Sequence, residues 1–451
     1  MNIRTDTKNC SSAIAEKRRH IREKHNPGRI SGCIAADIKN VLVINSASRS
    51  GSSFLHSVLS EHPDVISLNG EDVVFHKLHG IGTANTPDDS DCLHPDIRPD
   101  DPVLKNIACD ILDDAGCLQT GKNPFSREAY LTDCIQRFIL QWPKIQADPG
   151  MLYPCAARML EQDMQMHSEF VPARFWNSFL ACLAGQGVAV NPYYYDMPSE
   201  LIRETFPSLQ PSPEPPFDGG CIEEPPFVVP APRTFPSNTE IGKKTLLLKS
   251  SSNCYRIGFI KKLFPAARFR FILLARNPMA SINGMMDGWL SHGFFSHDLG
   301  SITRLGINGY SMPEKPWTLR WWKFDLPPGW AGYTDKPLEE VCAFQWQSAN
   351  DRILKDSDNG VFEKKLSLRY EDILSPSSLS HEINRIFDFA GLAYSDIAGG
   401  AAPARHVMSI TAPQPHKWLR HRHRLMPLCS GAVEATAARL GYNPKEAEKW
   451  P

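Results

Sequence analysis

The sequence predicts an α/β fold in which helices flank a parallel β-sheet. Three short apolar stretches, 41–44, 245–249 and 269–274, are typical of buried strands. The first and the third each run into a polar loop, and apolar residues at helical spacing follow. Because ligands bind at the carboxyl ends of strands in such sheets, we expect the functional residues in these two loops.

The loop after the first strand has the composition of an anion-binding site. Residues 45–53 contain five serines, one glycine and Arg49. Gly51 lets the backbone approach a ligand closely, Ser52 and Ser53 add hydroxyl donors, and the following helix directs its free amide groups at the loop. The spacing is not that of a Walker A loop. For this stretch taken alone, a serine-rich turn without a ligand remains the alternative.

A second cation follows the strand at 269–274. Arg276 lies in the segment Ala-Arg-Asn-Pro, and Ile282, Met285, Met286 and Trp289 continue from it at helical spacing. The carboxyl ends of parallel strands meet at one edge of the sheet. We therefore expect Arg49 and Arg276 to serve one anionic ligand.

These stretches resemble the sulfotransferases that use 3′-phosphoadenosine 5′-phosphosulfate (PAPS). Residues 49–55 are similar to the family's 5′-phosphosulfate loop, and residues 276–278 resemble the start of its 3′-phosphate motif. Five blocks similar to family motifs follow one another in the family's order. They are 49–55, 249–253 together with 263–265, 276–278, 368–374 and 416–418. Residues 81–240 and 288–340 show no such block, and we interpret them as insertions.

The resemblance implies a P-loop-like three-layer fold that binds PAPS, releases PAP and needs no metal. The donor-binding residues that it implies are Arg49, Ser50, Gly51, Ser52, Ser53, Phe54, Arg276, Ser281, Tyr370 and Lys417. The family usually has a serine eight positions after the arginine, but Gly284 stands there, so Ser281 or Asn283 would replace its hydroxyl. For Tyr370, a packed core aromatic is the alternative.

The expected catalytic residues are Glu71, Lys249 and Arg49. Several sulfotransferase branches use a glutamate about this far after the phosphosulfate loop as the general base, and Glu71 follows Arg49 by 22 positions (71 − 49). A carboxylate there would take the proton of the acceptor hydroxyl. Asp72 and His76 are the alternative bases. Lys249 would neutralise charge that develops on the leaving oxygen.

The acceptor site is harder to predict. Residues 127–142 and segments near 155–167 and 174–183 are expected to be helices of a substrate cap, whereas 81–125 has a loop-like composition. The aromatic-rich stretch 286–333 either packs onto the core or lines an acceptor pocket, with Trp289, His292 and His297 among its candidates and His76 nearby. The proline-rich stretch 207–236 is either an extended loop over the cleft or a linker. A loop over the cleft would allow Glu223 and Glu224 to reach the site, but a solvated role is the favoured interpretation.

Composition excludes several classes of protein. A formal charge of −1 gives no basis for binding nucleic acid or an anionic membrane, and no apolar run is long enough to span a bilayer. The twelve cysteines, without a C-x-x-C pair, predict reduced thiols and no metal site in a cytoplasmic protein. The N-terminus is charged and lacks a signal peptide, which favours the soluble, bacterial-type branch of the family.

The sequence therefore predicts a solvated N-terminal arm (1–35) and one sulfotransferase domain (36–451). The expected reaction moves a sulfuryl group from PAPS to a hydroxyl of a small metabolite or a carrier-bound natural-product intermediate, with an amine as the alternative acceptor group. The alternatives are a Mg²⁺-dependent nucleotide phosphotransferase with an atypical loop, or a nucleotide-binding protein without activity. The oligomeric state is not predicted.

Overall fold

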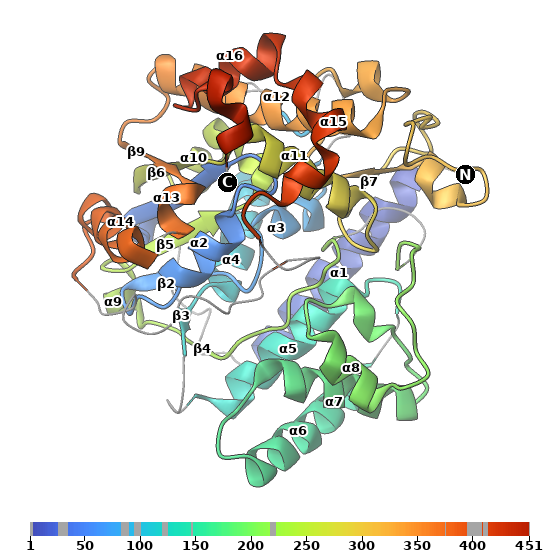
Figure 1. Cartoon of the computed structure of the whole chain (residues 1–451). Helices are drawn as coiled ribbons and strands as arrows, with labels where there is room; N and C mark the ends of the chain where they lie inside the picture. Colours follow the sequence, from blue (N-terminus) through green and yellow to red (C-terminus); the bar gives the residue numbers. More distant parts are fainter. Residues whose placement is uncertain are drawn as a thin grey trace.

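Five parallel strands in the order β2-β5-β1-β6-β9 form the central sheet (Figure 1). The computed structural model describes residues 3–25, 35–82, 90–93, 101–119, 125–145, 148–216, 222–374, 376–394, 408 and 414–450. The strands of this sheet are β1 Asn40–Ser46, β2 Val65–Ser67, β5 Thr245–Lys249, β6 Arg268–Ala275 and β9 Lys365–Arg369. The predicted α/β fold is confirmed.

Helices cover both faces of this sheet, which makes three layers. They are α2 Ser52–Leu59, α3 Val73–Leu78, α10 Ile257–Leu263, α11 Pro278–Trp289, α12 Leu338–Asp358, α13 Tyr370–Leu374 and α14 Pro376–Ala390. Alternate residues of β1 belong to different cores, because successive side chains of a strand point to opposite faces. Val41 and Val43 share a core with α3, α10, α11 and α12, whereas Leu42 and Ile44 pack with α2, α13 and α14.

A separate group of helices lies below the sheet in Figure 1. It consists of α5 Arg127–Gln141, α6 Pro149–Met166, α7 Pro172–Gly185 and α8 Ser199–Thr205. The helices predicted near 127–142, 155–167 and 174–183 are confirmed. Helix α6 starts earlier than predicted, because Asp148 accepts a capping hydrogen bond from Gly150 and Pro154 is tolerated inside the helix.

Two expectations about exposed segments are wrong. Helix α1, Ile3–His25, has one buried face: it packs on α3 and α5, and Arg18 and Arg22 bind the buried carboxylate of Asp110 at 2.8 and 2.7 Å. Within the stretch predicted to be a loop, α4 forms a helix over Asp101–Asp114. Its apolar residues recur at helical spacing, but the Asp- and Pro-rich flank concealed that period.

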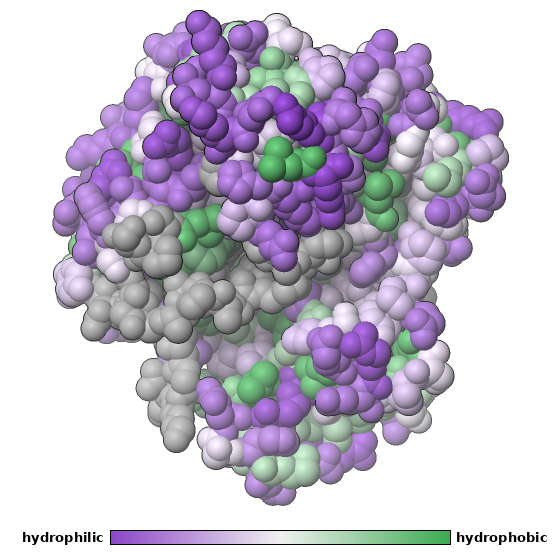
Figure 2. All heavy atoms as spheres, in the orientation of Figure 1, coloured by the Kyte–Doolittle hydropathy of each residue, from purple (hydrophilic) through white to green (hydrophobic). Residues whose placement is uncertain are grey.

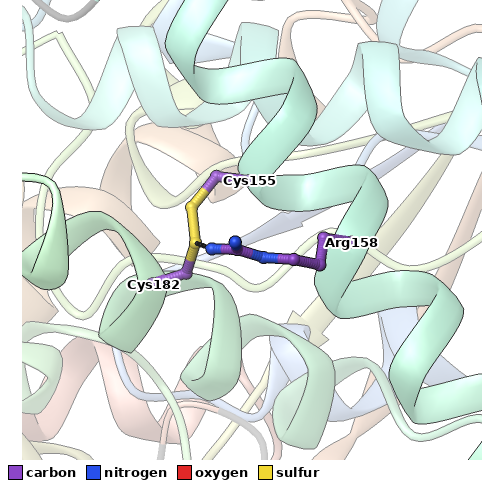
Figure 3. Close-up of a disulfide and its surroundings, with 3 residues drawn as sticks. All are labelled: Cys155, Arg158 and Cys182. Carbon is purple, nitrogen blue, oxygen red and sulfur yellow. Dashed lines mark hydrogen bonds between the residues drawn. A yellow bond between two sulfur atoms is a disulfide. The ribbon is translucent and has the colours of Figure 1, made fainter.

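The prediction of reduced cysteines is also wrong at one pair. Cys155 of α6 and Cys182 of α7 form a disulfide, and Arg158 contacts Cys182 at 2.9 Å (Figure 3). These cysteines are 27 positions apart, so only the contact between α6 and α7 brings them together. In the described part of the chain, Cys92, Cys109, Cys117, Cys134, Cys254, Cys342 and Cys429 are reduced, in no disulfide.

The aromatic-rich insertion packs mainly on the core. It contains the antiparallel strands β7 Phe295–Asp298 and β8 Trp321–Lys323. Trp289, Trp322 and Trp330 are buried, and the rings of Trp289 and Trp322 lie edge to face at 5.3 Å. The structure describes residues 207–216 and 222–236 of the proline-rich stretch. The second part is an extended loop anchored by the buried Phe227, so that prediction is confirmed there, whereas Phe217 lies outside the described residues.

Smaller elements complete the described chain. They are β3 Cys117–Leu118, β4 Arg233–Thr234, α9 Asn238–Ile241, α15 Arg422–Leu425 and α16 Gly431–Arg439. The face drawn in Figure 2 is mostly hydrophilic, and its apolar residues are scattered. Among the described residues, none of the helices has the length and apolar character needed to cross a bilayer.

Candidate active site

The loop after β1 turns sharply into helix α2. Arg49 and Gly51 both have positive φ angles, 63° and 87°, a region that glycine adopts at little cost. Helix α2 begins at Ser52, and the Leu55 amide donates to the Gly51 carbonyl at 3.1 Å. The free amide groups at the start of α2 therefore lie at the loop, as an anion site requires.

Gly51 is also required by close packing. The ring of Tyr370, at the start of α13, lies where a side chain at position 51 would have to be. The edge of the Phe54 ring meets the same tyrosine at 6.3 Å between ring centres. The β9–α13 junction is thus in direct contact with the loop.

Replacing Gly51 with alanine is expected to destabilise the fold by roughly 2 kcal/mol or more, because it adds a steric overlap to an unfavourable φ. Denaturant unfolding would measure the change. Gly80→Ala is the matched control, since Gly80 also has a positive φ (74°) but open space around it. Equal losses in the two variants would contradict the packing argument.

The second arginine lies against the same loop. Arg276 follows β6, which pairs directly with β1, and its Nη1 donates to the Arg49 carbonyl at 3.1 Å. Its guanidinium lies 5.0 Å from the centre of the Tyr370 ring. Asn277 caps α11 and donates from its side chain to Glu371 at 2.8 Å, which ties β6 to the β9–α13 junction.

Arg49 itself is partly buried. Its Nη1 donates to the Met408 carbonyl at 2.8 Å, and the guanidinium lies 5.4 Å from the centre of the Phe294 ring. Burial and, next, the charge of Arg276 lower the pKa of Arg49 to about 10. The side chain therefore remains a cation at neutral pH.

A lysine–glutamate pair lies on the other neighbouring strand. Lys249, at the end of β5, binds Glu71 with 2.5 Å between Nζ and Oε1, and Ser250 donates to the other carboxylate oxygen at 2.9 Å. The Lys249 side chain is 9% exposed and that of Glu71 is 27% exposed. Both groups are thus held firmly, but the carboxylate remains open to a ligand.

These groups line one open cavity of about 200 Å³. The residues predicted from the sequence that border it include Arg49, Gly51, Ser52, Ser53, Phe54, Glu71, Lys249, Arg276, Asn283, His297, Tyr370 and Lys417. Within the ranges that the structure covers, no three His, Cys, Asp or Glu side chains gather as metal ligands. The cavity combines cations and helix-terminal amides with the carboxylate of Glu71.

The profile of the sulfotransferase family matches residues 42–308, which is more than half of the chain. The protein is a member of the sulfotransferase family. A search of curated proteins finds no match.

Solved structures of other sulfotransferases are similar to this one only at low identity. The sulfotransferase domain of the Synechococcus PCC 7002 olefin synthase is 12% identical with a TM-score of 0.35, and 90% of this chain and 97% of that one are covered. A domain from the curacin biosynthetic pathway is 12% identical (TM-score 0.34; 90% and 99% covered). The enzyme STF9 from Mycobacterium avium is also 12% identical (TM-score 0.33; 93% and 79% covered).

Five residues expected at the site of this sulfotransferase do not border the cavity. They are Ser50, Ser281, His76, Trp289 and His292. Ser50 and Ser281 are fully buried. The cavity face of α11 is formed by Ala280, Asn283, Gly284 and Asp287, which are three or four positions apart, so Ser281 points elsewhere.

The alternative bases lie behind the cavity wall. His76 is fully buried, and its ring contacts that of Phe259 edge to face at 5.1 Å. Asp72 accepts a hydrogen bond from Asn253 at 3.0 Å, and burial raises its pKa to about 6. The substrate-site candidate Trp289 also lies away from the cavity and donates a hydrogen bond to Gln345 within the core. Of the three candidate bases, the structure brings only Glu71 to the cavity.

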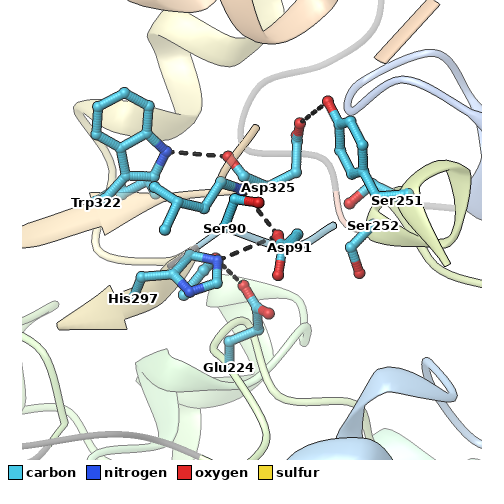
Figure 4. A network of polar contacts seen from close by, with 12 residues as sticks. Ser90, Asp91, Glu224, Ser251, Ser252, His297, Trp322 and Asp325 are labelled. Carbon is cyan, nitrogen blue, oxygen red and sulfur yellow. Dashed lines mark hydrogen bonds and ion pairs between the residues drawn. The ribbon is translucent and has the colours of Figure 1, made fainter. Parts of the chain in front are cut away.

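Sequence reasoning missed two carboxylates of the cavity wall, Asp91 and Asp325. Asp91 binds Arg256 and lies 3.4 Å from His297, and Figure 4 shows the His297 ring directed at Asp91 and Glu224. Although burial acts in the opposite direction, Arg256 and His297 hold the pKa of Asp91 well below its usual value. Asp91 lies between stretches of low apolar content, so the sequence around it has no hydrophobic periodicity from which its position could be predicted.

Glu223 and Glu224 also border the cavity, contrary to the solvated role expected for them. Glu223 is 4% exposed and pairs with Arg137 at 2.6 Å. Glu224 contacts Lys77 at 3.3 Å and Ser296. The proline-rich stretch therefore forms part of the cavity wall.

Asp325 makes stability depend on pH. It accepts hydrogen bonds from Ser48 at 2.7 Å and Tyr255 at 3.3 Å, and burial raises its pKa to about 7. A folded-state pKa above the unfolded value gives a contribution to stability that is complete below pH 4 and is lost as the pH rises through 7. Asp325→Asn should therefore raise the melting temperature, relative to wild type, by about 3 °C more at pH 8.5 than at pH 5. A difference that does not change with pH would contradict this assignment.

Proposed function

We propose that this sulfotransferase moves a sulfuryl group from PAPS to an acceptor hydroxyl and releases PAP. One observation carries the proposal: the ends of β1, β5 and β6 bring Arg49, Lys249 and Arg276 to the same cavity. Three strand-end cations and the amides of a helix N-terminus suit a ligand with several negative charges.

In this proposal each end of the donor has its own partners. Arg49, the Gly51–Ser53 amides and the hydroxyls of Ser52 and Ser53 bind the 5′-phosphosulfate. Arg276 and Lys417 bind the 3′-phosphate, and Tyr370 packs against the nucleotide. The scheme routes no step through a metal ion, because fixed cations and N–H groups supply the charge stabilisation.

Glu71 is the proposed general base. As the acceptor oxygen bonds to sulfur, its proton passes to the Glu71 carboxylate, and the bond between sulfur and the bridging oxygen breaks. The electron pair stays on the phosphate oxygen of PAP, where Lys249 offsets its charge. In the free enzyme Lys249 and Glu71 are paired at 2.5 Å. We infer that Lys249 exchanges Glu71 for the donor, which frees the base only when the donor is bound.

The acceptor is proposed to be a small metabolite or a carrier-bound intermediate. The cavity lining also mixes the apolar Val73, Val74 and Phe324 with Glu71 and Lys77, which suits a hydroxyl-bearing molecule of mixed polarity. The expected cytoplasmic location stays a prediction, and the Cys155–Cys182 disulfide removes part of its basis.

Turnover with PAPS tests this proposal. Incubation with PAPS and a panel of metabolites should give PAP and a product heavier by one sulfate group, detected by mass spectrometry. Binding of ATP that requires Mg²⁺, with no binding of PAP, would favour a phosphotransferase instead. PAP binding without turnover of any panel member would favour a binding protein without activity.

A further inference from the structure

Asp287 places a carboxylate inside the cationic end of the cavity. It lies in the last turn of α11 and borders the cavity together with Lys417. Its Oδ2 accepts from Lys417 Nζ at 2.9 Å, and its Oδ1 accepts from Arg420 Nη2 at 2.7 Å. Both cations come from the short helix η10, Lys417–His421. One carboxylate therefore bridges two cations, with the geometry that a bound phosphate would have.

Stability explains this carboxylate only in part. The Arg420 side chain is 46% exposed, and an ion pair with that exposure contributes about 1 kcal/mol or less, whereas Lys417 and Asp287, at 21% and 16%, form the more buried pair. In a cavity that receives a polyanion, a fixed negative charge repels the ligand. The charge of Asp287 also acts on Arg49, whose pKa it raises against the larger effect of burial.

The other residues on the cavity face of α11 provide few groups that could bind an anion. Gly284 carries no side chain and lies beside the Arg49 side chain. Asn283 Oδ1 lies 2.9 Å from Nδ1 of His421. In the free enzyme, the polar side chains of α11 and η10 that meet at this edge are thus bound to one another.

We propose that Asp287 takes the place of the donor's 3′-phosphate in the free enzyme and determines how strongly the enzyme prefers nucleotides that carry this phosphate. The proposal rests on the proposed function, since it assumes that the 3′-phosphate binds at Lys417. The phosphate has to displace Asp287 from Lys417 and Arg420, and the carboxylate then remains close to it. The gain in affinity from the 3′-phosphate is therefore smaller than the cations alone would give.

Calorimetry with PAP and with AMP, which lacks the 3′-phosphate, tests this in the wild type and in Asp287→Asn. The substitution keeps the shape and removes the charge. We expect PAP to bind about tenfold more tightly to the variant, and AMP to change by less than about twofold. The ratio of the two affinities should thus rise, and it should rise most at low salt.

Glu339→Gln is the matched control. Glu339 binds Arg424, a neighbour of η10, at 2.7 Å, but it does not border the cavity. This variant should leave both affinities unchanged. An equal gain for PAP and AMP in Asp287→Asn, or weaker binding of PAP, would overturn the inference while leaving the proposed function intact. Absence of PAP binding to the wild type would instead overturn the proposed function and the inference with it.

Discussion

Replacing Lys249 with methionine is expected to lower kcat at least about 10²-fold, because no cation then faces the oxygen that leaves with PAP. Methionine keeps most of the volume of the lysine stem, so the nearly buried position stays filled. Glu71 loses its 2.5 Å partner but keeps the hydrogen bond from Ser250. Single-turnover measurements with PAPS would separate this effect on chemistry from any change in donor binding.

A matched lysine lies at the opposite end of the same strand. Lys244 immediately precedes β5 and pairs with Asp64 at 2.9 Å, away from the cavity. Lys244→Met should therefore keep wild-type kcat. A Lys249→Met variant that turns over as fast as Lys244→Met would remove Lys249 from the mechanism.

The second large effect is expected for Glu71→Gln. Glutamine cannot take the acceptor proton, so kcat should fall about 10²-fold or more. The affinity for PAP should be unchanged or higher, because Lys249 no longer has to leave a carboxylate. Steady-state kinetics and calorimetry on the same preparation would measure both quantities.

Asp72→Asn is the comparison for this variant. Asp72 is adjacent in sequence but fully buried, and it accepts a hydrogen bond from Asn253. Asp72→Asn should therefore leave kcat close to that of the wild type. Near wild-type turnover in Glu71→Gln, combined with a large loss in Asp72→Asn, would move the role of base to Asp72.

The donor side of the cavity could be predicted because its signals are local. A strand, a polar loop and a helix follow one another within about twenty residues around Arg49, and again around Arg276. Because β1 and β6 pair in parallel, the loops that follow them meet at the same edge of the sheet, and no other contact has to be known to predict this. The same local logic was wrong for Ser281, because its position on α11 differs from the cavity face of Asn283 and Asp287.

The carboxylate-lined wall of the cavity could not be predicted, because it depends on tertiary contacts. Asp91, Glu224, His297 and Asp325 come from separate segments, and only the folded chain brings them to one wall (Figure 4). His292 and His297 looked equivalent in the sequence, but only His297 borders the cavity. The Cys155–Cys182 disulfide likewise depends on the packing of α6 on α7.

The central claim is that the ends of β1 and β6 hold one doubly phosphorylated adenosine. A crystal structure of the complex with PAP tests it most directly. We expect the 5′-phosphate within hydrogen-bond distance of the Gly51–Ser53 amides, and the 3′-phosphate on Arg276 and Lys417 with Asp287 displaced. PAP bound away from these residues, or contacting only one of the two strand ends, would contradict the account.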